Sequence, residues 1–243
     1  MKIISLNIWG GRIANPLNDF IKKHSDVDVF LLQEVIDPNL DFMELKAGDR
    51  AKVGEILIEH NSFYRPANSN GFGLASFIKK DIQVIEEGEI FIHRERGSVL
   101  GDKWWRDIGK NLQYLKIKDR NGLEYTLFNY HGLWDALGKI DTPDRVKQSE
   151  GIVGFLSKFS GNRILCGDFN LTPESDCLKL ITEKLDFKNL ITEFDIKSTR
   201  TSLYTRDNEQ YADYIFVPKD LTVKKFEVFY DEMSDHAALF LEI

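Results

Sequence analysis

The sequence predicts two packed β-sheets covered by helices. Segments rich in β-branched, aromatic and other apolar residues recur in both halves of the 243-residue chain, and helical patterns lie between them. The number of these strands favours packed sheets over a doubly wound parallel sheet. The sequence also contains no glycine-rich phosphate loop, which argues against an enzyme that uses a nucleotide cofactor.

The first half of the chain begins as strand, helix and strand. Apolar runs at 3–9 and 27–32 flank a segment, 15–24, in which Leu17, Phe20 and Ile21 recur at helical spacing. Further strands are predicted where β-branched and aromatic residues lie between glycine, asparagine or charged breaks, at 73–78, 82–92, 111–117 and 125–130. We therefore expect the middle of the chain to be rich in strands.

The second half opens with a long helix, predicted at 144–159 after the cap residue Thr142 and the early-turn residue Pro143. Its apolar residues share one face at a 3.6-residue period: Val146, Ile152, Val153, Leu156 and Phe159. The remaining elements are a strand at 163–166, a helix at 175–183, and strands at 211–217, 223–229 and 237–243. No low-complexity linker interrupts this order, so we expect a single domain over 1–243.

The charge balance is acidic, with 32 Lys and Arg against 39 Asp and Glu and a net charge of −7. This excludes a protein that binds nucleic acid through a broad basic surface, but it is compatible with a phosphate substrate if carboxylates gather around a divalent cation. Cys166 and Cys177 match no zinc-ligand spacing and are too few for a disulfide framework. With neither a signal-peptide pattern nor a membrane-spanning run in the sequence, we expect a cytoplasmic protein that does not insert into membranes. We also expect it to be a monomer.

Polar side chains that can bind metals or move protons stand at the ends of the predicted strands. They are Asn7, Glu34, His131, Asp168, Asn170, Asp213, Asp235 and His236. Singly, each has a structural explanation, such as a turn asparagine, a solvated strand end or a hydrogen-bonded loop histidine. Together they supply carboxylate oxygens for Mg²⁺ or Mn²⁺, imidazoles, and amides that can orient phosphate oxygens. The set therefore predicts metal-assisted hydrolysis of a phosphate ester.

The same residues belong to an ordered series of short motifs. The series runs Leu6-Asn7-Ile8-Trp9, Leu32-Gln33-Glu34-Val35, Tyr130-His131-Gly132, Gly167-Asp168-Phe169-Asn170, Asp213-Tyr214-Ile215-Phe216 and Ser234-Asp235-His236. It resembles the endonuclease/exonuclease/phosphatase superfamily over residues 3–243. The resemblance implies an α/β (α+β) fold, a four-layer sandwich in which two mixed, mainly antiparallel β-sheets lie face to face between flanking helices.

The resemblance also implies how the metal and the attacking water are held. Glu34 would be the principal ligand of Mg²⁺ or Mn²⁺, with Asn7 beside it and Asp235 in the first or second ligand shell. Asp168 would orient or deprotonate the water. A soft-ligand cluster of the kind that holds structural zinc is absent from the sequence.

Contacts with the phosphate are implied by the same resemblance. Asn170 and His131 would touch the scissile phosphate, and His236, held by Asp213, would stabilise the pentacovalent transition state or act as the base. A carboxylate beside an imidazole favours its protonated form and raises its pKa, which suits the electrostatic role better. Some relatives pair the first histidine with a carboxylate that would fall near 71–74. This sequence has none there, which leaves open what orients His131.

Three segments are predicted to contact the substrate, and two of them, 134–145 and 198–207, to border the cleft. They contribute Trp104, Trp105 and Arg106 from 93–110, Arg145 from 134–145, and Arg200 and Tyr204 from 198–207. Exposed tryptophans can stack on nucleic-acid bases, but they can equally anchor a loop to the body of the protein. Arg145 lies at the start of the predicted long helix, where the helix dipole disfavours a cation, so it is expected to contact the substrate or to form a structural salt bridge.

We expect a metal-dependent phosphoesterase that hydrolyses a phosphodiester or phosphomonoester in nucleic acid, at an end, a single strand or a lesion. One alternative is a small-molecule phosphatase or phosphodiesterase of the same superfamily. The other is a catalytically inactive binding module on the same fold. The sequence contains neither a long insertion that could hook into a duplex nor an apolar-aromatic hairpin suited to a bilayer.

Overall fold

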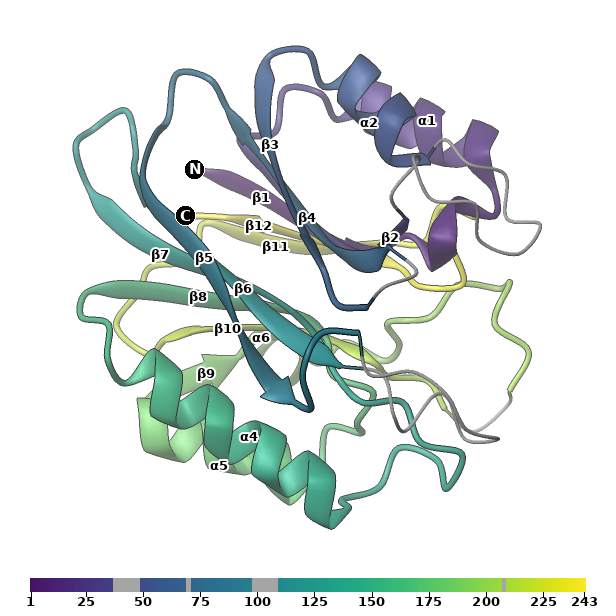
Figure 1. Cartoon of the computed structure of the whole chain (residues 1–243), viewed down its shortest axis with the longest axis vertical. Coiled ribbons are helices and arrows are strands. Elements are labelled where there is room, and N and C mark those ends of the chain that lie inside the picture. Colours follow the sequence, from purple (N-terminus) through teal and green to yellow (C-terminus); the bar gives the residue numbers. More distant parts are fainter. Residues whose placement is uncertain (37–48, 69–70, 98–108, 207–208) are drawn as a thin grey trace.

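Two β-sheets lie face to face, with helices on the outer sides (Figure 1). The computed structural model describes residues 1–36, 49–68, 71–97, 109–206 and 209–243. Over these ranges each sheet has six strands, of which one neighbouring pair is parallel and the others are antiparallel. This confirms the predicted sandwich of mixed, mainly antiparallel sheets.

The first sheet combines strands from both ends of the sequence. Its order is β11 (Lys225–Phe229), β12 (Ala238–Glu242), β1 (Lys2–Asn7), β2 (Val29–Ile36), β4 (Phe72–Lys79) and β3 (His60–Pro66). The central pair, β1 and β2, is parallel, with Asn7 opposite Gln33. Both strands therefore end at the same edge of the sheet.

The second sheet is built from the middle of the chain. Its order is β5 (Gln83–His93), β6 (Lys110–Lys118), β7 (Glu124–His131), β8 (Asn162–Asp168), β10 (Asp213–Pro218) and β9 (Phe187–Asn189). Here β7 and β8 form the parallel pair, and His131 lies opposite Asp168. The start of β10 adds Asp213 opposite Asp168, so three of the expected site residues meet at one edge.

Helices cover the outer faces of both sheets. Helices α1 (Ala14–Lys23) and α2 (Asp49–Ile56) lie over the first sheet, and α4 (Pro143–Leu156) and α5 (Asp176–Leu185) lie over the second. Two short helices complete the described part of the chain, η1 (Trp9–Gly11) and α6 (Leu190–Glu193). No helix in these ranges is long and apolar enough to cross a membrane.

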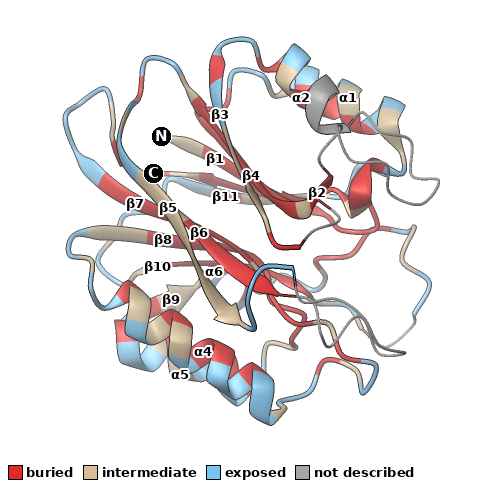
Figure 2. Ribbon diagram, in the orientation of Figure 1, coloured by how far each residue is buried: buried red, intermediate tan, exposed pale blue. Residues whose placement is uncertain are grey.

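The central strands are buried along most of their length (Figure 2), and their apolar residues pack on both faces of the sheet. Val29 and Leu31 of β2 pack into the core between the sheets, whereas Phe30 and Leu32 pack with Leu17 of α1 on the outer side. A strand covered on both faces needs an unbroken apolar run, which is why 27–32 does not alternate with polar residues. The predicted helix at 15–24 is confirmed with the same buried residues, Leu17, Phe20 and Ile21.

The buried face of α4 differs from the one that the sequence predicts. Val146 is exposed, and the residues that α4 buries include Arg145, Gln148 and Ser149 besides Ile152 and Leu156. The predicted cap is present, because the Thr142 side chain accepts a hydrogen bond from the Arg145 backbone N–H. Helix α4 therefore buries a partly polar face, and polar residues on that face bind the loop that precedes the helix.

A buried row of polar side chains links the two sheets. Gln33 Nε2 on β2 donates to Asn129 Oδ1 on β7 at 2.7 Å, and Asn129 Nδ2 donates back to the carbonyl of Leu32 at 3.1 Å. Ser76 on β4 donates to Gln113 Oε1 on β6 at 2.8 Å. Hydrogen bonds are directional, unlike apolar contacts, so this row fixes the position of one sheet against the other.

A bulge interrupts β2 where its site residue lies. The pairing of β2 with β4 shifts between Leu32 and Val35, and Glu34 has a φ of +56°. A non-glycine residue in the left-handed region is uncommon, and an extra residue in a bulge redirects its side chain. The bulge turns Glu34 towards the end of β7.

Glycine at position 167 is required by the close approach of β7 and β8. Its φ is +148°, and a Cβ atom there would lie 1.9 Å from the carbonyl oxygen of Tyr130. The residue after it is Asp168, so this close approach also places the Asp168 side chain.

Substitution of Gly167 is expected to disrupt this part of the sheet. The Gly167→Ala variant should lose more than about 3 kcal/mol of unfolding free energy, measured by urea denaturation, because backbone atoms must move. Gly161→Ala is the matched control: its φ is also positive, but open space surrounds its Cβ position. It should lose only about 1–2 kcal/mol, the cost of the left-handed backbone. Equal losses in the two variants would contradict this explanation.

Candidate active site

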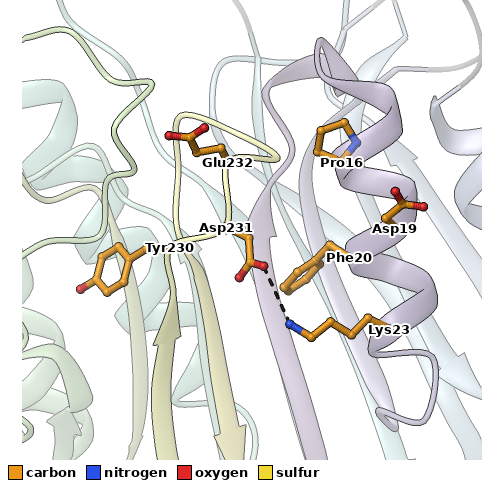
Figure 3. Close-up of a pocket in the computed structure, with 7 residues that line it drawn as sticks. All are labelled: Pro16, Asp19, Phe20, Lys23, Tyr230, Asp231 and Glu232. Atoms are coloured by element: carbon orange, nitrogen blue, oxygen red, sulfur yellow. Dashed lines mark ion pairs between the residues drawn. The ribbon is translucent and has the colours of Figure 1, made fainter.

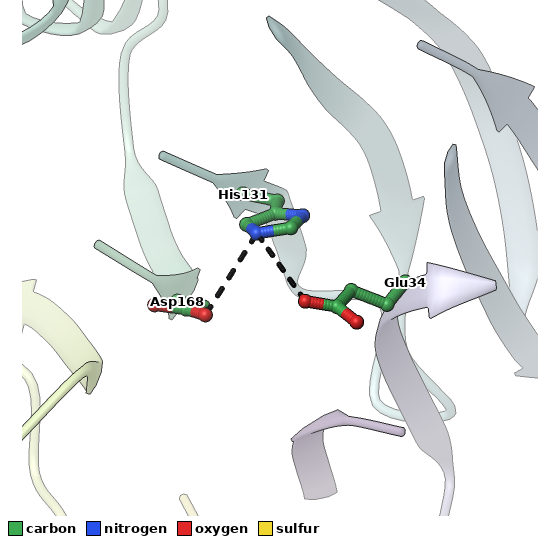
Figure 4. A group of neighbouring side chains, drawn as sticks. All are labelled: Glu34, His131 and Asp168. Carbon is green, nitrogen blue, oxygen red and sulfur yellow. Dashed lines mark ion pairs between the residues drawn. The ribbon is translucent and has the colours of Figure 1, made fainter. Parts of the chain in front are cut away.

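The eight expected site residues lie in one connected group. Figure 4 shows three of them, Glu34 from β2, His131 from β7 and Asp168 from β8, pointing towards one another. His131 Nε2 lies 3.8 Å from both Glu34 Oε1 and Asp168 Oδ2. The two sheets contribute opposite sides of this group, because Glu34 belongs to the first sheet and the other two residues to the second.

Asn7 connects the carboxylates of the group. Its Nδ2 donates to Glu34 Oε1 and to Asp168 Oδ2, each at 3.0 Å, and its Oδ1 accepts from the backbone N–H of Trp9 at 2.9 Å. Asn7 therefore presents its donor atom to the cluster. The Oδ1 atom has a second lone pair, so it could ligate a metal and still accept from Trp9.

Asp168 is held from two sides. Its Oδ1 accepts from the backbone N–H of Asn170 at 2.9 Å, while Oδ2 accepts from Asn7. Asn170 is buried with a φ of +54°, which completes the tight turn after β8. Burial opposes ionisation of Asp168, but the surrounding positive charges, of which His236 contributes most, together outweigh burial and lower the pKa of the carboxyl below its usual range.

His236 and Asp213 form a buried pair beside Asp168. His236 Nδ1 lies 2.7 Å from Asp213 Oδ2, and its Nε2 lies 3.7 Å from Asp168 Oδ2. Burial lowers the pKa of His236, but the charges of Asp213 and Asp168 outweigh it, and the net result is a raised pKa. The ring is thereby favoured as a cation with Nε2 directed at Asp168.

Asp235 lies on the far side of His236 from Asp213. Its Oδ1 is 3.8 Å from His236 Nε2, and its Oδ2 accepts from Arg200 Nη1 at 3.3 Å. Asp235 Oδ1 is buried and has no hydrogen-bond partner among the described residues. One oxygen of this carboxylate is therefore free to accept a further ligand.

His131 is surrounded by groups that keep it neutral. Burial and the nearby cation Lys110 lower the pKa of His131 to about 3. Lys110 is the first residue of β6, and burial lowers its own pKa to about 8. The segment 71–74 contributes no carboxylate to His131, as the sequence indicated; the acidic oxygens that face it are those of Glu34 and Asp168.

Two lysines of the site were not predicted from the sequence. Lys110 was part of the basic segment 93–110 but did not stand out from its neighbours, and Lys139 lies in the loop between β7 and α4. Both are buried. Only a weak sequence pattern indicated that either lysine is buried: Lys110 directly precedes the apolar strand 111–117, and Lys139 lies among Leu137, Gly138 and Ile140.

The expected substrate residues have different positions. Arg200 pairs with His236 in an isolated β-bridge, and its guanidinium lies 4.0 Å from the centre of the Tyr204 ring, so both residues border the cluster. Trp104, Trp105 and Arg106 lie outside the described residues.

Arg145 does not occupy the position expected of a substrate contact, and neither does it form a salt bridge in the described part of the chain. Its side chain is buried, and its guanidinium donates to the backbone carbonyls of Leu133, Gly138 and Ile140 at distances from 2.6 to 3.2 Å. Each of these carbonyls belongs to the loop between β7 and α4. Arg145 therefore fixes this loop.

Loss of Arg145 should loosen the loop. Arg145→Met keeps the length of the side chain but leaves the carbonyls unpaired, so we expect a loss of about 3 kcal/mol in unfolding free energy and faster limited proteolysis between 133 and 142. Lys147→Met, at an exposed position on α4, should change neither measurement. A variant with unchanged stability and only a raised KM would restore the substrate role of Arg145.

A surface pocket of about 580 Å³ lies apart from the cluster, between α1 and the segment that follows β11 (Figure 3). Lys23 reaches across it to Asp231, at 3.9 Å. None of the expected site residues lines this pocket. Its side chains bring together no histidine and no buried carboxylate, so we place the active site at the strand ends.

Two groups of three side chains are arranged to hold a metal ion. They are Glu34, His131 and Asp168, and Asp168, Asp213 and His236, with ligand atoms within 4.8 Å of one another in each group. The second group already forms the Asp213 and His236 hydrogen bond, whereas the first is joined only by longer contacts. A ligand set made mostly of carboxylate oxygens suits Mg²⁺ or Mn²⁺ better than zinc. The donor set of the first group, with the free oxygen of Asp235 near His236, fits such an ion.

A face-to-face pair of mixed sheets with carboxylates and histidines at their strand ends places the protein in a superfamily of phosphoesterase hydrolases. More narrowly, residues 4–236 match the model of the Endonuclease/Exonuclease/phosphatase family, and the chain belongs to that family. No curated protein matches the sequence.

Solved structures share the fold over nearly their whole length. An endonuclease/exonuclease/phosphatase from Bacteroides vulgatus aligns with a TM-score of 0.74 at 19% identity, covering 99% of this chain and 97% of that one. A mannosyl-6-phosphatase from Bacteroides thetaiotaomicron aligns with a TM-score of 0.76 at 16% identity, covering 100% and 98%. TDP2 from D. rerio, complexed with single strand DNA product, aligns with a TM-score of 0.73 at 15% identity, covering 99% and 97%.

Proposed function

We propose that the protein is a Mg²⁺- or Mn²⁺-dependent phosphoesterase that hydrolyses a phosphate ester in nucleic acid, at an end, a single strand or a lesion. One observation carries the proposal: Glu34, Asn7, Asp168, His236 and Asp213 form a continuous chain of contacts from one sheet to the other. Every position in this series of contacts holds a residue that can bind a metal, orient a phosphate or transfer a proton. This argues against an inactive binding module.

The metal ligands are proposed to be Glu34 and, near it, Asn7 and Asp235. A bound divalent cation supplies positive charge that offsets the charge developing on the phosphate oxygens. Glu34 is aimed at this position by the bulge in β2, at the cost of a left-handed backbone. Burial raises the pKa of Glu34, and a cation beside it would reverse that effect.

Asp168 is proposed to orient and deprotonate the attacking water. Hydrogen bonds from Asn7 and from the backbone of Asn170 hold its two oxygens in place, and its lowered pKa keeps it ionised. A fixed carboxylate loses little entropy when it binds water, which is the benefit of a preorganised site.

The phosphate itself is proposed to be bound by His131, Asn170 and His236. His131 stays neutral because burial lowers its pKa to about 3, so it would act by donating an N–H to a phosphate oxygen. The raised pKa of His236, caused mainly by the charge of Asp213, favours the protonated ring, which suits stabilisation of the pentacovalent transition state rather than proton abstraction. Asp213 acts through His236 and is a positioning residue.

The substrate class has two candidates with support from different neighbours. TDP2 from D. rerio was solved with single strand DNA product, and the mannosyl-6-phosphatase is named for a phosphorylated sugar. Their TM-scores of 0.73 and 0.76 against this chain are close. We place nucleic acid first, because Arg200 and Lys139 add positive charge beside the cluster, and keep a phosphorylated small molecule as the second candidate.

The proposal extends to how the protein occurs in the cell. A core that includes residues of both sheets supports a single domain over 1–243. Cys166 and Cys177 are free and buried, which agrees with a reducing compartment such as the cytoplasm. The protein is expected to act as a monomer, which light scattering in solution would test.

A panel of substrates tests the activity. With Mg²⁺ or Mn²⁺ present, the protein should hydrolyse at least one of single-stranded DNA, double-stranded DNA, RNA, abasic or 5′-tyrosyl ends, and phosphorylated small molecules. Glu34→Gln should lower kcat/KM at least about 100-fold, because the amide removes the ligand charge. Glu150→Gln, at an exposed position of α4, is the matched control and should keep full activity. Absence of turnover on every substrate would refute the proposed enzyme.

Metal binding and catalysis should separate at His236. We expect His236→Ala to lower kcat by about 10²-fold or more, because a charged group at the phosphate is removed, while Mg²⁺ still raises the melting temperature. Glu34→Ala should abolish both the activity and the Mg²⁺-dependent rise. If His236→Ala lost activity and metal stabilisation to the same extent, the electrostatic role of His236 would be wrong.

A further inference from the structure

Two loops meet beside the catalytic cluster. One joins β7 to α4 and the other precedes β10. They touch through paired side chains: Lys139 Nζ lies 5.9 Å from the centre of the Tyr204 ring, and the guanidinium of Arg206 lies 5.6 Å from that of Trp134. The expected catalytic residues come from strand ends, so these loop residues form a separate wall of the site.

Lys139 is buried in this wall beside the Tyr204 ring. Lys139 is 5% exposed, and its Nζ has no hydrogen-bond acceptor among the residues that the structure describes. The neighbouring Leu137 and Ile140 are exposed by 62% and 56%. The loop thus turns its apolar side chains outward and its cation inward, the reverse of the usual arrangement. A buried ammonium group without a partner costs stability, so its position calls for an anionic ligand.

A second cation lies close to Lys139. The Arg200 side chain is 5% exposed, its guanidinium rests on the Tyr204 ring at 4.0 Å, and its Nε is buried with no partner among the described residues. Asp235 accepts a hydrogen bond only from Nη1 of this guanidinium. Arg200 therefore keeps donor capacity directed away from the carboxylate.

The loop that carries Lys139 is held at both ends. Arg145 binds three of its backbone carbonyls, and Asp141 accepts hydrogen bonds from the Ser175 hydroxyl and from the backbone N–H groups of Asp176 and Cys177 at the start of α5. These contacts fix the backbone of the loop. The flexible four-carbon side chain of Lys139 still allows Nζ to move towards a ligand.

We propose that Lys139, Arg200 and Tyr204 form a second phosphate-binding subsite, so that the substrate carries another phosphate group beside the one that is hydrolysed. This rests on the proposed phosphoesterase function. The subsite borders the hydrolytic centre, because Arg200 donates to Asp235, a proposed metal ligand, whereas Lys139 and Tyr204 come from loops that contribute none of the expected catalytic residues. Lysine and arginine together offer a point charge and a planar fork of N–H donors, both of which phosphate oxygens accept.

Two kinds of substrate contain such a pair of phosphates. One is a nucleic-acid strand, in which a second phosphate follows along the backbone, and the other is a small molecule with two phosphate groups. Two matched pairs of probes separate them: thymidine 5′-(p-nitrophenyl phosphate) with and without a 3′-phosphate, and glucose 1,6-bisphosphate against glucose 6-phosphate. Within each pair the probes differ only by the extra phosphate.

Binding is measured first, by titration calorimetry in EDTA, where no turnover is expected. In the native protein the bisphosphate member of one pair should bind about tenfold more tightly than its partner, a difference of about 1.4 kcal/mol, since hydrogen bonds to charged groups are stronger than those between neutral groups. In Lys139→Met the two members should bind within twofold of each other. Lys139→Arg should keep most of the preference, and the exposed control Lys147→Met should keep all of it.

The outcomes distinguish the subsite from the proposed function. No preference for the bisphosphate member of either pair, or a preference that Lys139→Met leaves unchanged, would overturn the subsite even if the probes are hydrolysed with Mg²⁺. A Lys139-dependent preference without any hydrolysis would support the subsite and refute the proposed activity. Lys139→Met should also melt no lower than the native protein, because it removes an unpaired buried charge; a clearly lower melting temperature would assign Lys139 a structural role and overturn the proposal.

Discussion

The hydrogen bond between Gln33 and Asn129 is the contact on which the site depends. It crosses from β2 to β7 at 2.7 Å, one residue before Glu34 and two before His131. Apolar contacts between sheets would tolerate sliding, but a buried amide pair holds one register because breaking it leaves polar atoms unsatisfied. The 3.8 Å separation of Glu34 and His131 is thus set by residues that take no part in the chemistry.

Two of the six described non-glycine residues with a positive φ belong to the site. Glu34 and Asn170 both have a positive φ, although neither is glycine, and each costs of order 1–3 kcal/mol. The surrounding sheets offset this cost and hold Glu34 towards His131 and keep Asn170 in the turn after β8. The site therefore combines a rigid frame with two residues that would relax if the frame were absent.

The sequence predicted the parts of the fold and site that depend on local patterns. Residues at the ends of apolar runs, such as Asn7, Glu34 and Asp168, were identified because an apolar strand followed by a polar residue can be recognised in the sequence alone. Helix α2 and strand β3 were missed, since the strand's sequence, His-Asn-Ser-Phe-Tyr-Arg-Pro, is mostly polar and only partly buried. Lys139 was missed because its burial depends on how two distant loops meet, and the outward position of Val146 on α4 depends on what lies beneath the helix.

The order of strands in the first sheet has a consequence for how the protein folds. Strand β12 lies between β1 and β11, so Leu239 pairs with Ser5 from the opposite end of the chain, and the segment before β12 delivers Asp235 and His236. Such distant pairings close large loops and form slowly. During synthesis, Glu34 and Asp168 are made well before His236, so a growing chain lacks the complete set of catalytic groups. The proposed site is complete only when the last hairpin, β11 and β12, pairs with β1.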